Sequence, residues 1–207
     1  MSRALVVRCI PRGDTSATGR ILRAFLDSAR PQFVETVDLC VDHPDFLTDP
    51  DKANAYAKRS WSGIPLTPEE GKALAKSDRY VAQIMRTDCV IIAYPVYNFS
   101  MPAVVKAWFD SVIIKGLTFD EGSDGRAKGL LVRQKAVLIT VAGGHVSRSD
   151  HVDHSTALST SLLNYIGIKQ IHTIIAEDLD AQMERREALI QQAINNARIV
   201  GNIALAR

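Results

Sequence analysis

The sequence predicts an α/β fold in which helices cover both faces of a parallel β-sheet of five strands. Short runs of β-branched and aliphatic residues alternate along the chain with segments of helical periodicity. Two of those runs, residues 89–94 and 136–141, are almost continuously apolar, as is typical of central strands that are buried on both faces. With 207 residues, of which 46% are hydrophobic, residues 1–207 are expected to form a single domain.

The predicted elements alternate between strand and helix, which requires right-handed crossovers. The predicted strands are residues 5–9, 33–39, 89–94, 136–141 and 171–176. The predicted helices are residues 19–29, a helix that begins with Thr67 as the capping residue and Pro68 in its first turn, and residues 103–113, 156–166 and 179–203. Residues 41–66 contain three prolines and Trp61 with little periodicity, so we expect an irregular excursion with a binding or interface role.

Charge and cysteine content argue against several classes of protein. The formal net charge of +2 comes from 25 basic and 23 acidic residues that are interleaved, so nucleic acid is not an expected partner. No apolar run reaches the roughly 18 residues of a membrane span, and the chain starts directly with strand-forming residues, so a cytoplasmic protein with no membrane partner is expected. Cys9, Cys40 and Cys89 are widely spaced, which argues against a disulfide framework or a zinc site and favours reduced thiols.

The loops after the first, third and fourth strands are expected to form one binding site, because ligands of such sheets bind beyond the carboxyl ends of the strands. After the first strand, residues 10–19 are rich in hydroxyls and turn formers and lead into a helix, which favours an anion seat with Thr15, Ser16 and Thr18 as donors. The alternative is that Thr15 or Ser16 only caps the helix. The glycine patterns of dinucleotide-binding and P-loop proteins are absent from the sequence.

The other two loops favour a flat ligand. Residues 95–102 carry two prolines around two aromatic residues and Asn98. Such a loop is rigid, so a planar ring system can lie against it while Asn98 reaches the polar edge of the ring. The alternative is a core aromatic cluster at a strand end. After the fourth strand, Gly143 and Gly144 permit close approach of the backbone to a ligand.

Three histidines follow the glycines. His145, His151 and His154 lie near Asp150 and Asp153 in the sequence, but their spacing matches no established metal site, so no metal is predicted. Proton delivery to a bound ligand by one of these histidines is a hypothesis.

Taken in order, these segments resemble the family of FMN-dependent NADH-azoreductases and NADH:quinone oxidoreductases. Tyr97-Asn98-Phe99 is similar to the flavin loop of that family, and the similarity continues through residues 105–110 and 116–119, with further matches at residues 66–68 and 165–168. The resemblance covers nearly the whole chain. It implies a flavodoxin-like, doubly wound sheet with strand order 2-1-3-4-5, FMN as the cofactor, and a homodimer with two active sites at its interface.

The resemblance also implies roles for individual residues. Residues 16–18 match the phosphate contact, residues 96–99 the isoalloxazine contact and residues 141–144 a further flavin contact. The complete set of expected cofactor-binding residues is Cys9, Ser16, Ala17, Thr18, Pro95, Val96, Tyr97, Asn98, Phe99, Val141, Ala142, Gly143 and Gly144. The residues expected to face the substrate are Phe119, Glu121, His145 and Tyr165.

Four positions depart from the family pattern. Cys9 stands where the family usually has a serine, Val96 replaces a methionine, Val141-Ala142 replaces Ser-Arg, and Glu121 replaces an aromatic residue. Because backbone groups make many of the flavin contacts, these departures affect the expected substrate preference more than the cofactor.

The expected activity is reduction of quinones and azo compounds by NADH or NADPH through a ping-pong mechanism, with the flavin performing the chemistry and no catalytic side chain. An electron-transfer flavodoxin is the alternative, but such carriers tend to be strongly acidic and this chain is nearly neutral. A cysteine phosphatase based on Cys9 requires an arginine six residues later, where this sequence has Thr15.

Overall fold

A computed structural model of the chain describes residues 2–62, 64–146 and 154–205. Its centre is a sheet of five strands in the order β2-β1-β3-β6-β7, and every neighbouring pair is parallel. The strands are β1 (Arg3–Arg8), β2 (Phe33–Asp38), β3 (Cys89–Pro95), β6 (Lys135–Val141) and β7 (Gln170–Ala176). The predicted α/β fold with a five-stranded parallel sheet is confirmed.

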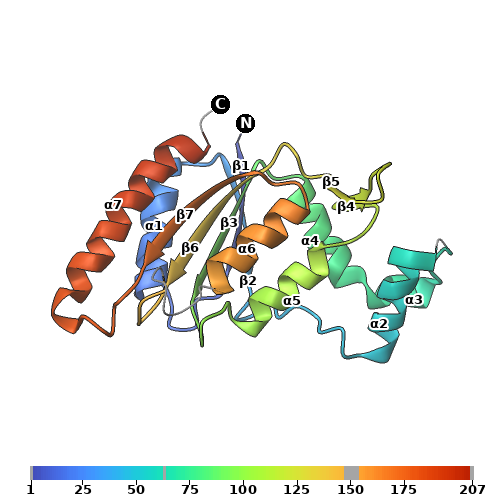
Figure 1. Ribbon diagram of the computed structural model, residues 1–207, viewed down its shortest axis with the longest axis horizontal. Helices are drawn as coiled ribbons and strands as arrows, with labels where there is room; N and C mark the ends of the chain where they lie inside the picture. Colours follow the sequence, from blue (N-terminus) through green and yellow to red (C-terminus); the bar gives the residue numbers. More distant parts are fainter. Residues whose placement is uncertain (1, 63, 147–153, 206–207) are drawn as a thin grey trace.

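Helices cover both faces of the sheet (Figure 1), and an apolar core lies between the sheet and the helices on each face. Because side chains alternate along a strand, Val90 and Ile92 of β3 join one core while Ile91 and Ala93 join the other. The first core is completed by α4 (Ala75–Met85), α5 (Ala103–Val112) and α6 (His154–Tyr165), and the second by α1 (Ala17–Ala29) and α7 (Arg186–Ala204).

The predicted helix over residues 179–203 is wrong at its beginning. Residues 183–185 form one 3₁₀ turn, and α7 starts only at Arg186. The reason lies at Asp178, which has φ 63° and donates its backbone N–H to the carbonyl oxygen of Gly144 at 3.0 Å. This contact holds the chain against the loop that follows β6 before α7 can begin.

The helix predicted to begin at Thr67 is present with a complete capping box, in which the Thr67 hydroxyl accepts from the Glu70 N–H and the Glu70 carboxylate accepts from the Thr67 N–H. This helix, α3 (Pro68–Ala73), is interrupted at Leu74, and α4 continues from Ala75.

Residues 41–66 are more regular than predicted. They include α2 (Pro50–Ala57), which Asp49 caps, and a π-helical turn at Lys58–Ser62. Only Ala55 and Ser60 are buried within these two elements, so an apolar periodicity that would have revealed the helix is lacking. α2 and α3 project away from the sheet beyond α4 and α5 (Figure 1).

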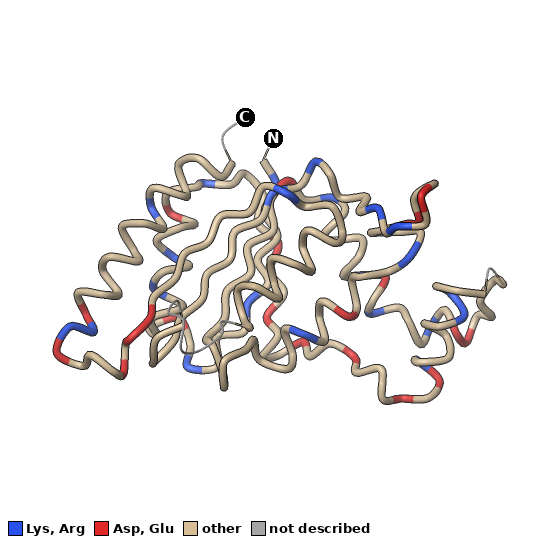
Figure 2. Tube along the Cα trace, in the orientation of Figure 1, with Lys and Arg blue, Asp and Glu red and all other residues tan. Residues whose placement is uncertain are grey.

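A short antiparallel pair of strands was not predicted. β4 (Phe119–Glu121) and β5 (Ala127–Gly129) have three residues each, and only Phe119 is buried. Basic and acidic residues are interspersed over the molecule, as Figure 2 shows. Among the described residues, no helix has the combined length and hydropathy of a membrane span.

Candidate functional site

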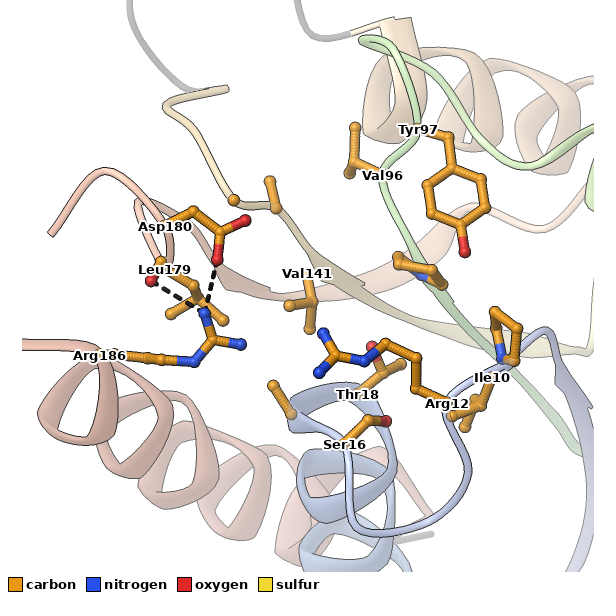
Figure 3. Close-up of a pocket in the computed structure, with 15 residues that line it drawn as sticks. Ile10, Arg12, Ser16, Thr18, Val96, Tyr97, Val141, Leu179, Asp180 and Arg186 are labelled. Atoms are coloured by element: carbon orange, nitrogen blue, oxygen red, sulfur yellow. Dashed lines mark hydrogen bonds and ion pairs between the residues drawn. The ribbon is translucent and has the colours of Figure 1, made fainter. Parts of the chain in front are cut away.

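A pocket of about 290 Å³ lies at the carboxyl ends of four strands. Its position beyond the carboxyl edge is where ligands of parallel sheets bind, and its volume is near the lower end of the roughly 300–1,000 Å³ of small-molecule sites. Figure 3 shows the lining residues converging from the loops after β1, β3, β6 and β7. They are Ile10, Pro11, Arg12, Ser16, Ala17, Thr18, Pro95, Val96, Tyr97, Val141, Ala142, Gly143, Leu179, Asp180 and Arg186.

The N-terminus of α1 forms one wall of the pocket. Ser16 is the N-cap, and its Oγ accepts a hydrogen bond from the Gly19 N–H at 3.3 Å. The capping role is therefore real, but it uses only an acceptor site of the hydroxyl and leaves its hydrogen available for donation. Because the first backbone N–H groups of a helix lack intrahelical partners, Ala17 and Thr18 add donors at the positive end of the helix dipole.

A salt-bridge network fixes the loop before α1. Arg8, at the end of β1, lies 2.7 Å from the carboxylate of Asp14 in the loop and 2.8 Å from that of Asp38 at the end of β2. The Arg8 side chain is 28% exposed, so this network is partly screened by solvent. Its geometric effect is to hold the loop to both strand ends.

Two arginines bring positive charge to the pocket. Arg12 lies over Ser16 and Thr18 in Figure 3, and no residue within the described ranges makes a hydrogen bond or ion pair with its guanidinium. Arg186 is fixed, because it donates to the carbonyl oxygen of Leu179 at 3.0 Å and to Asp180 Oδ1 at 2.6 Å. The pocket thus contains one arginine that is paired within the protein, Arg186, and one, Arg12, that has no partner among the described residues.

The loop after β3 makes a tight turn that presents aromatic rings to solvent. Tyr97 and Ser100 exchange backbone hydrogen bonds of 2.8 and 3.0 Å, and Asn98 and Phe99 between them have φ of 46° and 69°. Positive φ at both central residues is typical of a type I′ turn, where asparagine is favoured but phenylalanine is strained. Tyr97 is 48% exposed and Phe99 is 53% exposed, so these rings do not form the core aromatic cluster that was the alternative.

The thiols of Cys9 and Cys40 influence the Tyr97 hydroxyl electrostatically. Burial raises the pKa of the Tyr97 hydroxyl, the two thiols act in the same direction, and Arg12 opposes them.

The loop after β6 is supported by the loop after β7. Gly143 accepts a hydrogen bond from the Asp180 N–H at 2.8 Å, and Ala142 accepts one from the Leu179 N–H at 3.3 Å. A Cβ atom on Gly143 would overlap the carboxylate of Asp180. Because this contact is with the end of the exposed Asp180 side chain, a rotation of that side chain relieves it, and packing alone does not require glycine here.

Nine of the thirteen residues expected to bind the cofactor line the pocket, from Ser16 to Thr18, from Pro95 to Tyr97 and from Val141 to Gly143. The remaining four are adjacent to it. Cys9 is buried at the start of the loop after β1, Asn98 and Phe99 occupy the tip of the turn, and Gly144 is an exposed neighbour of Gly143.

The four residues expected to face the substrate lie outside the lining. Phe119 is buried against Tyr165 with 4.8 Å between the ring centroids, and Glu121 pairs with Lys115 at 3.1 Å. His145 Nδ1 lies 2.8 Å from a carboxylate oxygen of Asp178.

Of the remaining histidines and aspartates in the histidine-rich segment, the structure describes only His154. His154 is exposed, and its backbone N–H donates to the carbonyl oxygen of Phe99 at 3.2 Å. His151, Asp150 and Asp153 lie outside the described residues. In the described part of the chain, no group of three or more candidate ligands is positioned to hold a metal ion.

Sequence reasoning missed three pocket residues after β7, which are Leu179, Asp180 and Arg186. The loop after the fifth strand could have been included in the predicted site, because the carboxyl end of that strand lies at the same edge of the sheet as the others. It was not included, because residues 179 and 180 were predicted to belong to a helix. Arg12 lies in a loop that was singled out, but its side chain was given no role.

Comparison with known proteins establishes the family. A family model described as a flavodoxin-like fold matches residues 2–199. An FMN-dependent NADH:quinone oxidoreductase of Shewanella amazonensis is 33% identical over 204 residues, which cover 97% of this chain and 100% of the relative. The chain belongs to this flavodoxin-like family of oxidoreductases. A second such enzyme, of Clostridium beijerinckii, is 30% identical over 96% of this chain and 97% of its own.

Solved structures agree with this assignment. An azoreductase from Bacillus anthracis has a TM-score of 0.88 and 27% identity, and the match covers 98% of this chain and 99% of the azoreductase. An FMN-dependent NADH-azoreductase from Bacillus anthracis in complex with FMN shares the fold, with a TM-score of 0.82 at 22% identity over 98% of this chain and 100% of its own. The resemblance drawn from the loop motifs is confirmed.

The strain at Phe99 predicts an unusual order of stabilities. Phe99→Ala and Phe99→Gly both remove the ring, but only alanine keeps the Cβ that disfavours a left-handed backbone. We therefore expect Phe99→Gly to have the larger free energy of unfolding, by about 1 kcal/mol, measured by urea denaturation.

Ala157→Gly, at an exposed position within α6, is the matched control and should lower stability instead. Equal stabilities of the two Phe99 variants would show that the turn relaxes and that Phe99 is not strained.

Proposed function

We propose that this chain is an FMN-dependent oxidoreductase that uses NADH or NADPH to reduce quinones and azo compounds. The observation that carries the proposal is the meeting of an anion-binding helix N-terminus, a rigid aromatic turn and a glycine loop around one pocket. Its relatives named as FMN-dependent NADH:quinone oxidoreductases match along nearly their whole length, which supports a reductase rather than an electron carrier.

The residues of the pocket fit FMN. Ser16, Thr18 and the first backbone N–H groups of α1 would hold the phosphate. The guanidinium of Arg12, which has no partner among the described residues, would offset its charge. Pro95, Val96 and Tyr97 would lie against the isoalloxazine ring, with Asn98 near its polar edge. The backbone of residues 141–143 would contact the remaining edge.

The chemistry that bound FMN would supply is hydride acceptance from the nicotinamide and two-electron transfer to the acceptor. This chain would bind and orient the reactants: the turn at residues 97–100 and the loop at residues 142–146 are both fixed by backbone hydrogen bonds, so they are preorganised. The nicotinamide and the acceptor would use the same face of the flavin in turn, which is a ping-pong mechanism. Contacts from Phe119, Glu121, His145 and Tyr165 to the substrate belong to this proposal.

The central prediction concerns the purified protein. It should show the visible absorbance of an oxidised flavin and release FMN on denaturation, and initial rates at several NADH and quinone concentrations should give parallel double-reciprocal lines. A protein that does not bind added FMN overturns the proposal, and intersecting lines overturn its ping-pong part.

Arg12 gives a sharper test of the phosphate seat. Arg12→Gln should weaken FMN binding by about ten- to a hundredfold, because a hydrogen bond to a charged group contributes roughly 1.5–3 kcal/mol. Binding of riboflavin, which has no phosphate, should be unchanged in the same titration by flavin fluorescence.

Arg23→Gln is the matched control for that experiment, since Arg23 is exposed on α1 and does not line the pocket. An equal loss for FMN and riboflavin in Arg12→Gln would assign Arg12 to general support of the pocket instead of the phosphate.

The proposal includes a homodimer. Exposed apolar side chains gather before and after α2, with Phe46 48%, Trp61 65% and Ile64 60% exposed, and such groups mark interaction surfaces. Tyr165 is 41% exposed and would reach toward the partner's flavin.

Sedimentation equilibrium should give the mass of a dimer, and Trp61→Glu should shift it toward the monomer because a buried charge is costly. Ile199→Glu, at an exposed position on α7 across the sheet, should leave the dimer intact. A monomeric wild-type protein contradicts this part of the proposal.

A further inference from the structure

Two cysteines meet beside the pocket. The Sγ atoms of Cys9 and Cys40 are 3.9 Å apart although 31 positions separate the residues in the chain. Cys9 directly follows β1, and Cys40 lies two residues beyond the end of β2. Both side chains belong to the same core, in which Cys9 is buried and Cys40 packs at the edge.

The backbone around the two thiols is compatible with a covalent bond. β1 and β2 are adjacent parallel strands, and the Leu39 N–H continues their pairing by donating to the Arg8 carbonyl oxygen at 2.8 Å. The register that pairs Arg8 with Asp38 places Cys40 one residue beyond the position opposite Cys9. With about 4.8 Å between strands and about 3.3 Å of rise per residue, such diagonal neighbours lie about 6 Å apart, within the roughly 4.4–6.8 Å between Cα atoms that a disulfide spans. Side-chain rotation is then the main movement needed for the sulfur atoms to reach about 2 Å.

The two thiols differ in access to solvent. Cys9 is 4% exposed, and burial, followed by the neighbouring Cys40 thiol, raises the pKa of Cys9 to about 12. Cys40 is partly exposed. An oxidant from solvent therefore reaches Cys40 first, and Cys9 is positioned as the second thiol.

We propose that Cys9 and Cys40 form a reversible redox site, in which a peroxide converts the thiol pair into an intramolecular disulfide. The Cys40 thiol attacks one oxygen of hydrogen peroxide and becomes a sulfenic acid, releasing one water. The Cys9 thiol then attacks the Cys40 sulfur, and the sulfenic hydroxyl leaves as a second water. The two thiols together lose two electrons and two protons, and the peroxide is reduced to two waters.

This site goes beyond the proposed oxidoreductase activity and does not depend on it. The bond would join the loop that begins with the pocket residue Ile10 to the segment that leads into α2. A thiol–disulfide exchange reagent reverses it, so the reduced state expected from the sequence and the oxidised state are two forms of one protein.

The test uses the full-length protein, reduced with dithiothreitol, desalted and exposed to a small excess of hydrogen peroxide. After denaturation, the free thiols are alkylated. The protein is then digested, and the masses of the peptides are measured by mass spectrometry. We expect a linked Cys9–Cys40 peptide pair that is lighter than the two thiol peptides by two hydrogen atoms and that dithiothreitol separates.

Cys89 is the internal control, because it is fully buried in the opposite core and should be alkylated as a free thiol. Recovery of Cys9 as a free thiol together with Cys40 as a sulfinic or sulfonic acid would overturn the proposal, and so would a disulfide between two chains or the survival of all three thiols.

Cys40→Ser supplies the matched variant. Its fold is checked by circular dichroism, and Cys9 in this variant should remain alkylatable after the same exposure because its redox partner is missing. Loss of the Cys9 thiol at the wild-type rate in Cys40→Ser would show that Cys9 reacts without Cys40 and would overturn the proposal.

Discussion

The site depends on the register of the parallel sheet. Pro95 of β3 pairs with Val141 of β6, which in turn pairs with Ala176 of β7, so three strands end at one level. The hydrogen bond from the Val96 N–H to the Val141 carbonyl oxygen extends that pairing by one residue at 2.8 Å. Because all strands run the same way, their loops emerge at one edge and can surround a single ligand. A shift of one residue would exchange the two faces of a strand, and both cores oppose it.

Backbone bonds, more than side chains, give the pocket its shape. The turn at residues 97–100 closes on itself, and residues 178–181 donate N–H groups to the carbonyls of residues 142–144. Such contacts survive changes of side chain. The pocket can therefore keep its shape although Val96, Val141 and Ala142 depart from the pattern that the resemblance implies.

The strands could be predicted because burial on both faces leaves apolar runs, as in β3 and β6, and the two loops that end these strands followed directly. The helix α2 could not be predicted, because only one of its residues is buried and its sequence therefore has no apolar periodicity. The start of α7 depends on a contact between Asp178 and Gly144, distant in sequence, which local propensity cannot express. The positive φ of Phe99 could not be predicted from the sequence either, because phenylalanine is not a preferred residue at the second central position of a type I′ turn.

The arrangement of charge shows how the site can differ from its family while keeping the fold. The resemblance places an arginine where this chain has Ala142, a residue without charge. Two guanidinium groups nevertheless reach the pocket from other elements, Arg12 from the loop after β1 and Arg186 from the start of α7. Asp180 pairs with Arg186 and reduces its net contribution, whereas no described carboxylate pairs with Arg12. Because electrostatic attraction falls with distance from the charge, the guanidinium of Arg12 concentrates positive potential at the N-terminus of α1 (Figure 3). There it adds to the helix dipole, so an anionic group is favoured most strongly at that end.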